Sequence, residues 1–323
     1  MPGYLTDVPG LLVGHATDPV GGTGCTAVLC PAGAVGGVEA RGWATGLLGL
    51  DVLDPRHVAE RIHGVVLAGG SAFGLETAFG VMAHLEARGV GFPTPGGPVP
   101  LVAGAILYDL GTGDRRARPD RAMGQRAADA ATAGPLEEGS VGAGTGASVG
   151  KLFGRARAMK GGLGTASRRV RAVHVGALVV VNALGDVRDP ASGALVAGAR
   201  DAPEGRVLVD TARALREGAA PPAFGGAHTT IGVVATDARL TKSEAARLAG
   251  LAHLGLAATL SPPHTTVDGD ALFALSTGDA AAVPLDLLGL AAADCVAEAV
   301  VRAVRAAVAL GGLPAARDLE SGP

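Results

Sequence analysis

The chain has 323 residues, of which 48% are hydrophobic, 3% are aromatic and 52 are glycine. This composition predicts a soluble, folded protein with a core of small aliphatic side chains, and the length allows one large domain or two ordinary ones. The net charge of −3 comes from 27 basic and 30 acidic residues without a block of like charge, which argues against a nucleic-acid or membrane-surface binder. We therefore expect a small, neutral ligand.

The start of the chain and its cysteines bear on the compartment. Residues 1–10, MPGYLTDVPG, have neither the basic nor the apolar region of a secretory signal, so we expect a cytoplasmic protein. The cysteines show no CxxC spacing, which favours buried thiols over a disulfide framework or a zinc site: Cys25, Cys30 and Cys295.

The first two thirds of the chain alternate strand and helix patterns. Residues 64–71 are a buried-strand run that ends in glycine, and residues 72–89 have helical spacing and a glycine stop. Residues 136–154 are rich in glycine and predict a loop. The stretch 172–187 is the most β-branched part of the chain and predicts one or two buried strands closed by a Gly-Asp turn.

The last third of the chain begins with an irregular segment that is followed by a strand pattern. Residues 216–228 are rich in Gly, Pro and Ala and predict an irregular, accessible connection, after which TTIGVVAT has strand composition. A helix follows, and Thr241 with Glu244 forms a capping box at its start. Residues 264–278 are again strand-like, with an Asp-Gly-Asp turn inside them.

The apolar stretch 285–313 has the length of a membrane span but is interrupted by charges. Asp294, Glu298 and Arg302 are four residues apart and share one helical face. We therefore expect an amphipathic helix whose other faces lie in a core, and no membrane-spanning segment.

Two glycine motifs resemble known sites without matching them. In GAGTGASVGK, Thr145 stands where a phosphate loop has glycine, and Leu152 replaces the Ser or Thr that would hold magnesium. Ser71 lies in G-S-x-x-G rather than in the G-x-S-x-G of a nucleophile elbow, so we interpret it mainly as a turn or helix-cap serine.

Three polar residues in unusual surroundings are candidates for chemistry. Lys151 is one of three lysines among the 27 basic residues and follows the glycine loop, where it is either a solvated loop residue or a cation in a cleft. Asn182 interrupts the apolar run VVVNALGDV, so its buried amide needs partners and is either structural or a donor to an oxyanion. The residues that follow Asp270 provide no further calcium ligands, which argues against a metal at the D-G-D turn.

The tripeptide His-Thr-Thr occurs twice, at residues 228–230 and 264–266. A threonine hydroxyl is a weak nucleophile unless a base lies beside it, and an N-terminal threonine supplies that base from its own α-amino group. Its reference pKa of about 7.7–8.0 suits general-base catalysis. At the first copy an accessible segment ends at His228 and a strand begins at Thr229, as self-cleavage would require. The residues alone leave open whether Thr229 is a nucleophile or an ordinary strand residue.

Seven motifs in order resemble the DmpA-type aminopeptidase family, which includes the nylon-oligomer hydrolases. The resemblance runs from about residue 5 to about residue 312, on these stretches: TDVPGLLVGHATD, VVLAGGSAFGLETAFGVM, GAILYDLG, GAGTGASVGK, VVVNALGDV, HTTIGVVATDARLTKSEAARLA and DGDALFALSTG. It implies an α/β fold, a four-layer α-β-β-α sandwich of the N-terminal-nucleophile type. It also implies one domain, 1–323, that cuts itself into an α chain 1–228 and a β chain 229–323, and a homo-oligomer of four or more subunits.

The resemblance assigns roles residue by residue. Thr229 would be the nucleophile with its freed amine as the base, and Asn182 would supply the oxyanion amide. Lys151, Asp268 and Asp270 match residues of the nylon-hydrolase branch, in which they belong to the site. Tyr108 matches a tyrosine near the site of the aminopeptidase branch. His228 is a departure, because the family commonly has Asn or Gly before the cleaved bond. The β-aminopeptidase branch has Ser and Glu at the two aspartate positions.

The sequence thus predicts a self-processed hydrolase of amide bonds in short peptides or 6-aminohexanoate-type oligomers, without a metal or organic cofactor. Three alternatives remain. An acyltransferase similar to ornithine acetyltransferases would use the same Thr229, a serine hydrolase would use Ser71, and a non-catalytic small-molecule-binding protein would stay uncut.

Overall fold

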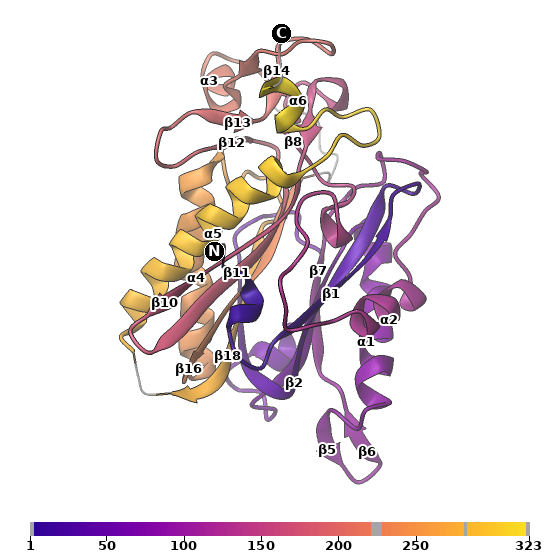
Figure 1. Ribbon diagram of the computed structural model, residues 1–323, viewed down its shortest axis with the longest axis vertical. Coiled ribbons are helices and arrows are strands. Elements are labelled where there is room, and N and C mark those ends of the chain that lie inside the picture. Colours follow the sequence, from indigo (N-terminus) through magenta and orange to yellow (C-terminus); the bar gives the residue numbers. More distant parts are fainter. Residues whose placement is uncertain (1–2, 221–227, 281–282, 321–323) are drawn as a thin grey trace.

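The structure, a computed structural model, describes residues 3–220, 228–280 and 283–320. Two β-sheets pack face to face, and a pair of helices covers the outer face of each (Figure 1). This α-β-β-α order confirms the fold class expected from the resemblance. None of the described helices is long and apolar enough to cross a membrane.

Strand β2, Thr23–Ala40, belongs to both sheets. Its first half pairs with β1, Leu12–Asp18, on one side and with β4, Ile62–Ala68, on the other. Its second half pairs with β18, Ala271–Ala280, after a shift of register. One long strand therefore fixes the two sheets relative to each other.

The other strands extend the sheets outward from β2. In the first sheet β4 pairs in parallel with β7, which pairs with β3; in the second sheet β18 pairs in parallel with β16, followed by β11 and β10. Their bounds are Leu47–Leu48 for β3, Val102–Ile106 for β7, Gly162–Val170 for β10, Val173–Asn182 for β11 and Thr229–Ala238 for β16.

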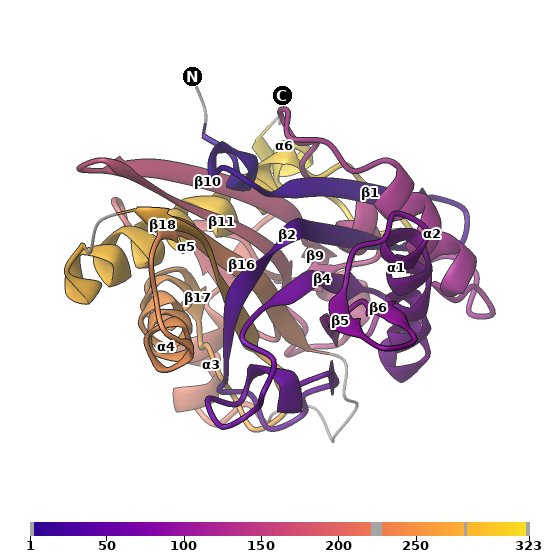
Figure 2. The ribbon, with the colours of Figure 1, turned by 90° about the horizontal axis from the view of Figure 1, so that it is seen from below.

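Helices α4 and α5 pack on the second sheet, and α1 and α2 pack on the first. The view from below separates the two pairs, with the sheets between them (Figure 2). The helix bounds are Thr77–Glu86 for α1, Arg121–Asp129 for α2, Lys242–Thr259 for α4 and Leu285–Ala306 for α5.

Shorter elements lie around this sandwich. They are β5 (Phe92–Thr94), β6 (Gly97–Val99), β8 (Ser148–Val149), β9 (Met159–Lys160), β12 (Asp186–Arg188), β13 (Leu195–Ala197), β14 (Ala199–Arg200), β15 (Leu208–Val209), β17 (Leu260–Ser261), α3 (Thr211–Arg216) and α6 (Ala316–Glu320). Five 3₁₀ turns complete the described elements: Leu5–Asp7, Asp51–Leu53, Ser71–Glu76, Gly142–Gly144 and Arg155–Arg157.

The alternation of side chains along β11 explains how one apolar run serves two cores. Leu178 and Val180 face the first sheet, whereas Val179 and Val181 face helices α4 and α5. Successive side chains of a strand point to opposite faces, so a strand buried on both sides is apolar throughout. This is why residues 172–187 contain a continuous hydrophobic run.

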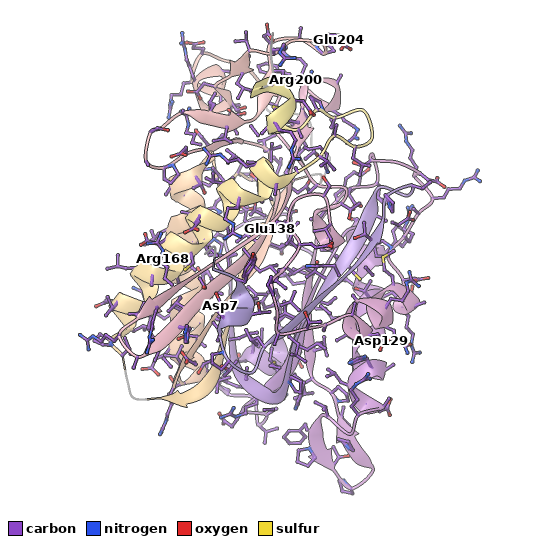
Figure 3. The ribbon with its side chains drawn as sticks, in the orientation of Figure 1. Asp7, Asp129, Glu138, Arg168, Arg200 and Glu204 are labelled. Carbon is purple, nitrogen blue, oxygen red and sulfur yellow. The ribbon has the colours of Figure 1, made fainter. Side chains whose placement is uncertain are left out.

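Charged residues on α5 meet the edge of the second sheet. Arg168 of β10, labelled in Figure 3, lies 3.5 Å from a carboxylate oxygen of Asp294 and 3.5 Å from one of Glu298. Arg302 of the same helix lies 2.6 Å from Glu138. The expected amphipathic helix is confirmed, but it ends at Ala306, where the following backbone becomes extended, and not at residue 313.

Several other predicted elements are also present. The capping box of Thr241 and Glu244 is formed at the start of α4, and the three thiols are free and buried. Residues 72–89 begin with 3₁₀ turns before α1, and the strand expected over 264–278 begins at Ala271. Of the connection expected over 216–228, residues 221–227 lie outside the described residues.

Candidate active site

The first His-Thr-Thr copy lies at the start of β16, opposite the end of β11. Thr229 pairs there with Asn182, and His228 and Thr229 are 4% and 3% exposed. The Thr229 hydroxyl donates a hydrogen bond to the carbonyl oxygen of His228. The hydroxyl therefore lies beside the peptide bond whose cleavage would make Thr229 a chain terminus.

The same carbonyl oxygen has a second donor that the sequence did not reveal. The backbone N–H of Gly269 lies 2.8 Å from it. A side chain at this glycine would not fit, because its Cβ would lie 2.8 Å from the Thr229 hydroxyl oxygen and 2.5 Å from the carbonyl oxygen of Ala44. A fixed backbone donor at this position can stabilise negative charge that develops on the oxygen. The sequence holds no signal for this donor, because every residue other than proline has a backbone N–H.

Asn182 has the partners that a buried amide requires. Its Oδ1 accepts hydrogen bonds from the backbone N–H of Ser148 at 3.0 Å and from the Lys151 ammonium at 2.9 Å. Its Nδ2 donates to the carbonyl oxygen of Tyr108 at 3.3 Å. These contacts fix which end of the amide is the donor and hold the group beside the start of β16.

Lys151 is not a solvated loop residue. It is 7% exposed, and its ammonium also donates to the backbone oxygen of Asn182 at 2.8 Å. Burial lowers the pKa of Lys151 to about 7, and the nearby carboxylate of Asp268 opposes this shift. The glycine loop thus holds the Lys151 side-chain nitrogen against Asn182 and does not have the residues of a phosphate loop.

Asp268 and Asp270 are each 1% exposed and lie where β11 ends and β16 begins. Asp270 Oδ1 accepts a hydrogen bond from the N–H of Thr230 at 2.6 Å, and Asp268 Oδ1 accepts one from the N–H of Leu184 at 3.2 Å. Burial, with the charge of Asp270 beside it, raises the pKa of Asp268 to about 6. The carboxylates therefore hold the backbone of Thr230, next to Thr229, and the backbone of Leu184, two residues after Asn182.

Tyr108 reaches the site through its main chain. Its carbonyl oxygen accepts the Asn182 amide, while its half-buried ring has no role that this geometry assigns. The next residue, Asp109, accepts hydrogen bonds from the Thr23 hydroxyl and the Gly70 N–H, both at 2.7 Å. Burial raises the pKa of Asp109 to about 6.

Lys160 is a second buried lysine that the sequence did not single out. It is fully buried and donates to the carbonyl oxygens of Thr145 and Ala147, both at 2.7 Å. Burial lowers the pKa of Lys160 to about 7, and Asp109 opposes the shift. Lys160 therefore fixes the glycine loop that carries Ser148 and Lys151. The sequence feature that could have indicated Lys160 is the scarcity of lysine, since the chain has three lysines among 27 basic residues.

Ser71 occupies the turn between β4 and α1. Its φ of 55° is unusual for a residue other than glycine, and its N–H donates to the carbonyl oxygen of Leu107 at 2.9 Å. This geometry fits the interpretation as a turn residue. Within the described part of the chain, no group of three His, Cys, Asp or Glu side chains is placed to hold a metal ion.

The chain is similar to known proteins in sequence and in fold. The model of Peptidase family S58 matches residues 4–316. An uncharacterized aminopeptidase of Mycobacterium leprae is 41% identical, over 96% of this chain and 92% of its own. A 6-aminohexanoate-oligomer endohydrolase of Kocuria is 36% identical, over 84% of this chain and 74% of its own.

Solved structures show the same fold. The L-aminopeptidase D-Ala-esterase/amidase of Ochrobactrum anthropi, described as a variant of the Ntn hydrolase fold, superposes with a TM-score of 0.72 at 24% identity, over 97% of this chain and 90% of that one. A β-aminopeptidase of Burkholderia gives a TM-score of 0.68 at 24% identity, over 99% and 94%. The family model matches nearly the whole length of the chain, and the aminopeptidase of Mycobacterium leprae is 41% identical to it. The chain therefore belongs to Peptidase family S58, the DmpA-type aminopeptidases that its motifs resemble.

Proposed function

We propose that this chain is an N-terminal-threonine hydrolase that cuts itself between His228 and Thr229 and then cleaves amide bonds. Membership of a peptidase family makes it a hydrolase of amide bonds. The proposal adds the self-cleavage, which yields an α chain 1–228 and a β chain 229–323, and the roles of the individual residues.

The environment of the His228 carbonyl group is the observation that carries the proposal. The Thr229 hydroxyl and the Gly269 N–H both donate to its oxygen, the latter at 2.8 Å. In the self-cleavage, the hydroxyl oxygen attacks the carbonyl carbon, and the negative charge that forms on the carbonyl oxygen faces the Gly269 N–H. The C–N bond then breaks, the hydroxyl proton ends on the new amine, and water hydrolyses the resulting ester.

The mature enzyme repeats this chemistry on a substrate amide. The free α-amine of Thr229 takes the hydroxyl proton and delivers it to the leaving amine, so that an ester to Thr229 forms and water then releases the acid. Gly269 and Asn182 are the donors to the oxyanion. Lys151 orients Asn182 and adds positive potential, while Asp268 and Asp270 hold the strand ends around the new terminus.

The substrates we propose are short peptides and ω-amino-acid oligomers. This rests on relatives named as an aminopeptidase, 41% identical, and as a 6-aminohexanoate-oligomer endohydrolase, 36% identical. The two aspartates of the D-G-D turn favour the second class, because they match the nylon-hydrolase branch.

We also propose that the protein is cytoplasmic and forms a homo-oligomer of four or more subunits. Light scattering of the purified protein tests the number of subunits.

Intact-mass analysis of the purified protein tests the self-cleavage. We expect a fragment of about 9 kDa that begins with Thr-Thr-Ile-Gly, in proportion to its share of the 31.6 kDa chain. The Thr229→Ala variant should remain one chain and hydrolyse neither aminoacyl p-nitroanilides nor 6-aminohexanoate trimer. Ser71→Ala is the control and should behave as wild type. A wild-type chain that stays intact, or an active Thr229→Ala variant, contradicts the proposal.

A further inference from the structure

The second His-Thr-Thr copy, residues 264–266, lies beside the D-G-D turn, and its first two residues contact the two carboxylates in the same way. The backbone N–H of His264 and its Nδ1 lie 3.1 Å and 2.8 Å from Asp270 Oδ2. The backbone N–H of Thr265 lies 3.0 Å from Asp268 Oδ2, and the Thr265 hydroxyl donates to the same oxygen. Each residue thus gives one backbone and one side-chain donor to a single carboxylate oxygen.

The backbone at His264 shows that this arrangement is imposed by its surroundings. His264 has a φ of 53°, in the left-handed region that residues other than glycine rarely adopt. Such a conformation costs free energy and persists only where the surrounding structure determines it. The ring of His253 from α4 lies edge-on to the His264 ring with centroids 4.9 Å apart, and it packs there against the turn.

The opposite oxygen of each carboxylate is bound to a strand end of the candidate site. Asp270 Oδ1 accepts the Thr230 N–H, so Asp270 joins His264 to the peptide next to Thr229. Asp268 Oδ1 accepts the Leu184 N–H, so Asp268 joins Thr265 to the end of the strand that carries Asn182. Gly269, between the two, donates to the His228 carbonyl oxygen.

We propose that His264 and Thr265 are positioning residues for the hydrolysis, which fix the two carboxylates and thereby the placement of Thr229 and of the Gly269 donor. This inference rests on the proposed function, and it assigns a role to a motif that the mechanism does not otherwise use. Neither residue contacts the reacting atoms directly.

The Thr265 hydroxyl has a further effect on the charge of its carboxylate. Hydrogen bonds from Thr265 and Leu184 lower the pKa of Asp268, against the larger upward effects of burial and of Asp270. The charged groups that act on Asp268 are Asp270 on the same turn and Lys151 from the glycine loop, and the backbone of His228 pairs with that of Asp268. Loss of the hydroxyl therefore raises the pKa of Asp268 further, toward neutral pH.

Paired variants in the full chain test the proposal. Thr265→Val keeps the shape of the side chain and removes its donor, and Thr265→Ser restores the donor. His264→Gly keeps the backbone N–H, tolerates the left-handed conformation and removes the ring, while His264→Asn supplies a side-chain N–H and also tolerates that conformation. Thr266→Ala, at the exposed third residue of the same tripeptide, is the control.

We expect Thr265→Val and His264→Gly to lower kcat for an aminoacyl p-nitroanilide roughly 10- to 100-fold with little change in KM, because a small misplacement of reacting groups has effects of this size. The acid limb of the kcat profile should move to higher pH in Thr265→Val. Thr265→Ser and His264→Asn should restore most of the loss, and the control should match wild type.

Two outcomes overturn the inference. Wild-type kcat and an unmoved acid limb in Thr265→Val and His264→Gly, with Thr229→Ala inactive, would leave the proposed function standing and remove the positioning role. A loss of kcat that Thr265→Ser and His264→Asn do not restore, accompanied by a lower melting temperature, would make the two residues merely structural. An active Thr229→Ala variant would instead contradict the proposed function itself.

Discussion

The side-chain nitrogen of Lys151 lies 2.9 Å from Oδ1 of Asn182 and 2.8 Å from its backbone oxygen. The cation holds the acceptor end of the amide, and the donor end is directed to the side on which the Tyr108 carbonyl lies. Because a cation cannot bind the amide nitrogen, the amide cannot turn over without losing this contact. Lys151 and Asn182 therefore act as one unit in the proposed mechanism.

Replacement of Asn182 by Asp tests the oxyanion role. The two side chains have nearly the same shape, and a carboxylate still contacts Lys151, but the N–H donor is lost. We expect kcat to fall by about 10²- to 10³-fold, as when an oxyanion donor is removed from other hydrolases, with a smaller change in KM. Steady-state kinetics on the purified variant measure this, with circular dichroism to verify the fold. A kcat within twofold of wild type would contradict the assignment.

Lys151→Met removes the cation that holds Asn182. We expect kcat to fall roughly 10- to 100-fold, because the donor is then misplaced. Lys242→Met is the matched control, since Lys242 is 5% exposed and donates to the backbone oxygens of Val52 and Asp54 rather than to a residue of the candidate site. Equal losses of kcat in the two variants would show that any buried lysine has this effect and would remove the role of Lys151.

The elements were predictable where one local pattern determines them. Thr241 and Glu244 form the capping box that their spacing indicated, and the β-branched run before Asn182 forms a buried strand. The pairing of β2 with strands of both sheets could not be predicted because it depends on strands far away in the chain. Local sequence says little about such long-range register.

The sequence indicated which side chains gather at the candidate site, but not which backbone donors do. Asn182, Lys151 and the two aspartates stand out as polar residues in apolar or glycine-rich surroundings, and the structure brings them together around Thr229. The Gly269 N–H carries no such mark, because every residue except proline has one and only the fold aims it at a particular carbonyl oxygen.

The two buried lysines of the glycine loop region make stability depend on pH. The pKa of Lys151 and of Lys160 falls from 10.5 to about 7 on folding, so between these values the unfolded chain binds more protons than the folded one. The free energy of unfolding therefore increases as the pH rises from 7 to 9. This gain in stability is lost again as the pH falls back toward 7.

Lys160→Met should make this slope smaller, because one of the two lysines no longer titrates. Urea unfolding at pH 7, 8 and 9 in the uncut Thr229→Ala background measures it, since that background keeps the protein a single chain. Parallel stability curves for the two proteins would show that Lys160 is not the source of the slope.

Thr241→Ala removes the N-cap of α4, the helix that carries His253. The Thr241 hydroxyl accepts the Glu244 N–H at 3.3 Å, and the Glu244 carboxylate accepts the Thr241 N–H at 2.8 Å. We expect a loss of about 1 kcal/mol in the free energy of unfolding. Ser243→Ala, at an exposed position that is the second residue of the same helix, is the control and should not destabilise. Equal stability of Thr241→Ala and wild type would contradict the prediction.

Gly269→Ala tests whether the D-G-D turn must approach Thr229 as closely as the structure has it. The added Cβ would lie 2.8 Å from the Thr229 hydroxyl oxygen and 2.5 Å from the Ala44 carbonyl oxygen, and the latter belongs to backbone that cannot turn away like a side chain. We expect self-cleavage and hydrolysis to slow about 100-fold, because the hydroxyl or the Gly269 N–H is displaced from the His228 carbonyl group. Gly96→Ala is the matched control, since the nearest atom to its Cβ would be 3.8 Å away. Self-cleavage of Gly269→Ala at the wild-type rate, followed by intact mass, would show that the contact between this turn and Thr229 is not needed for the chemistry.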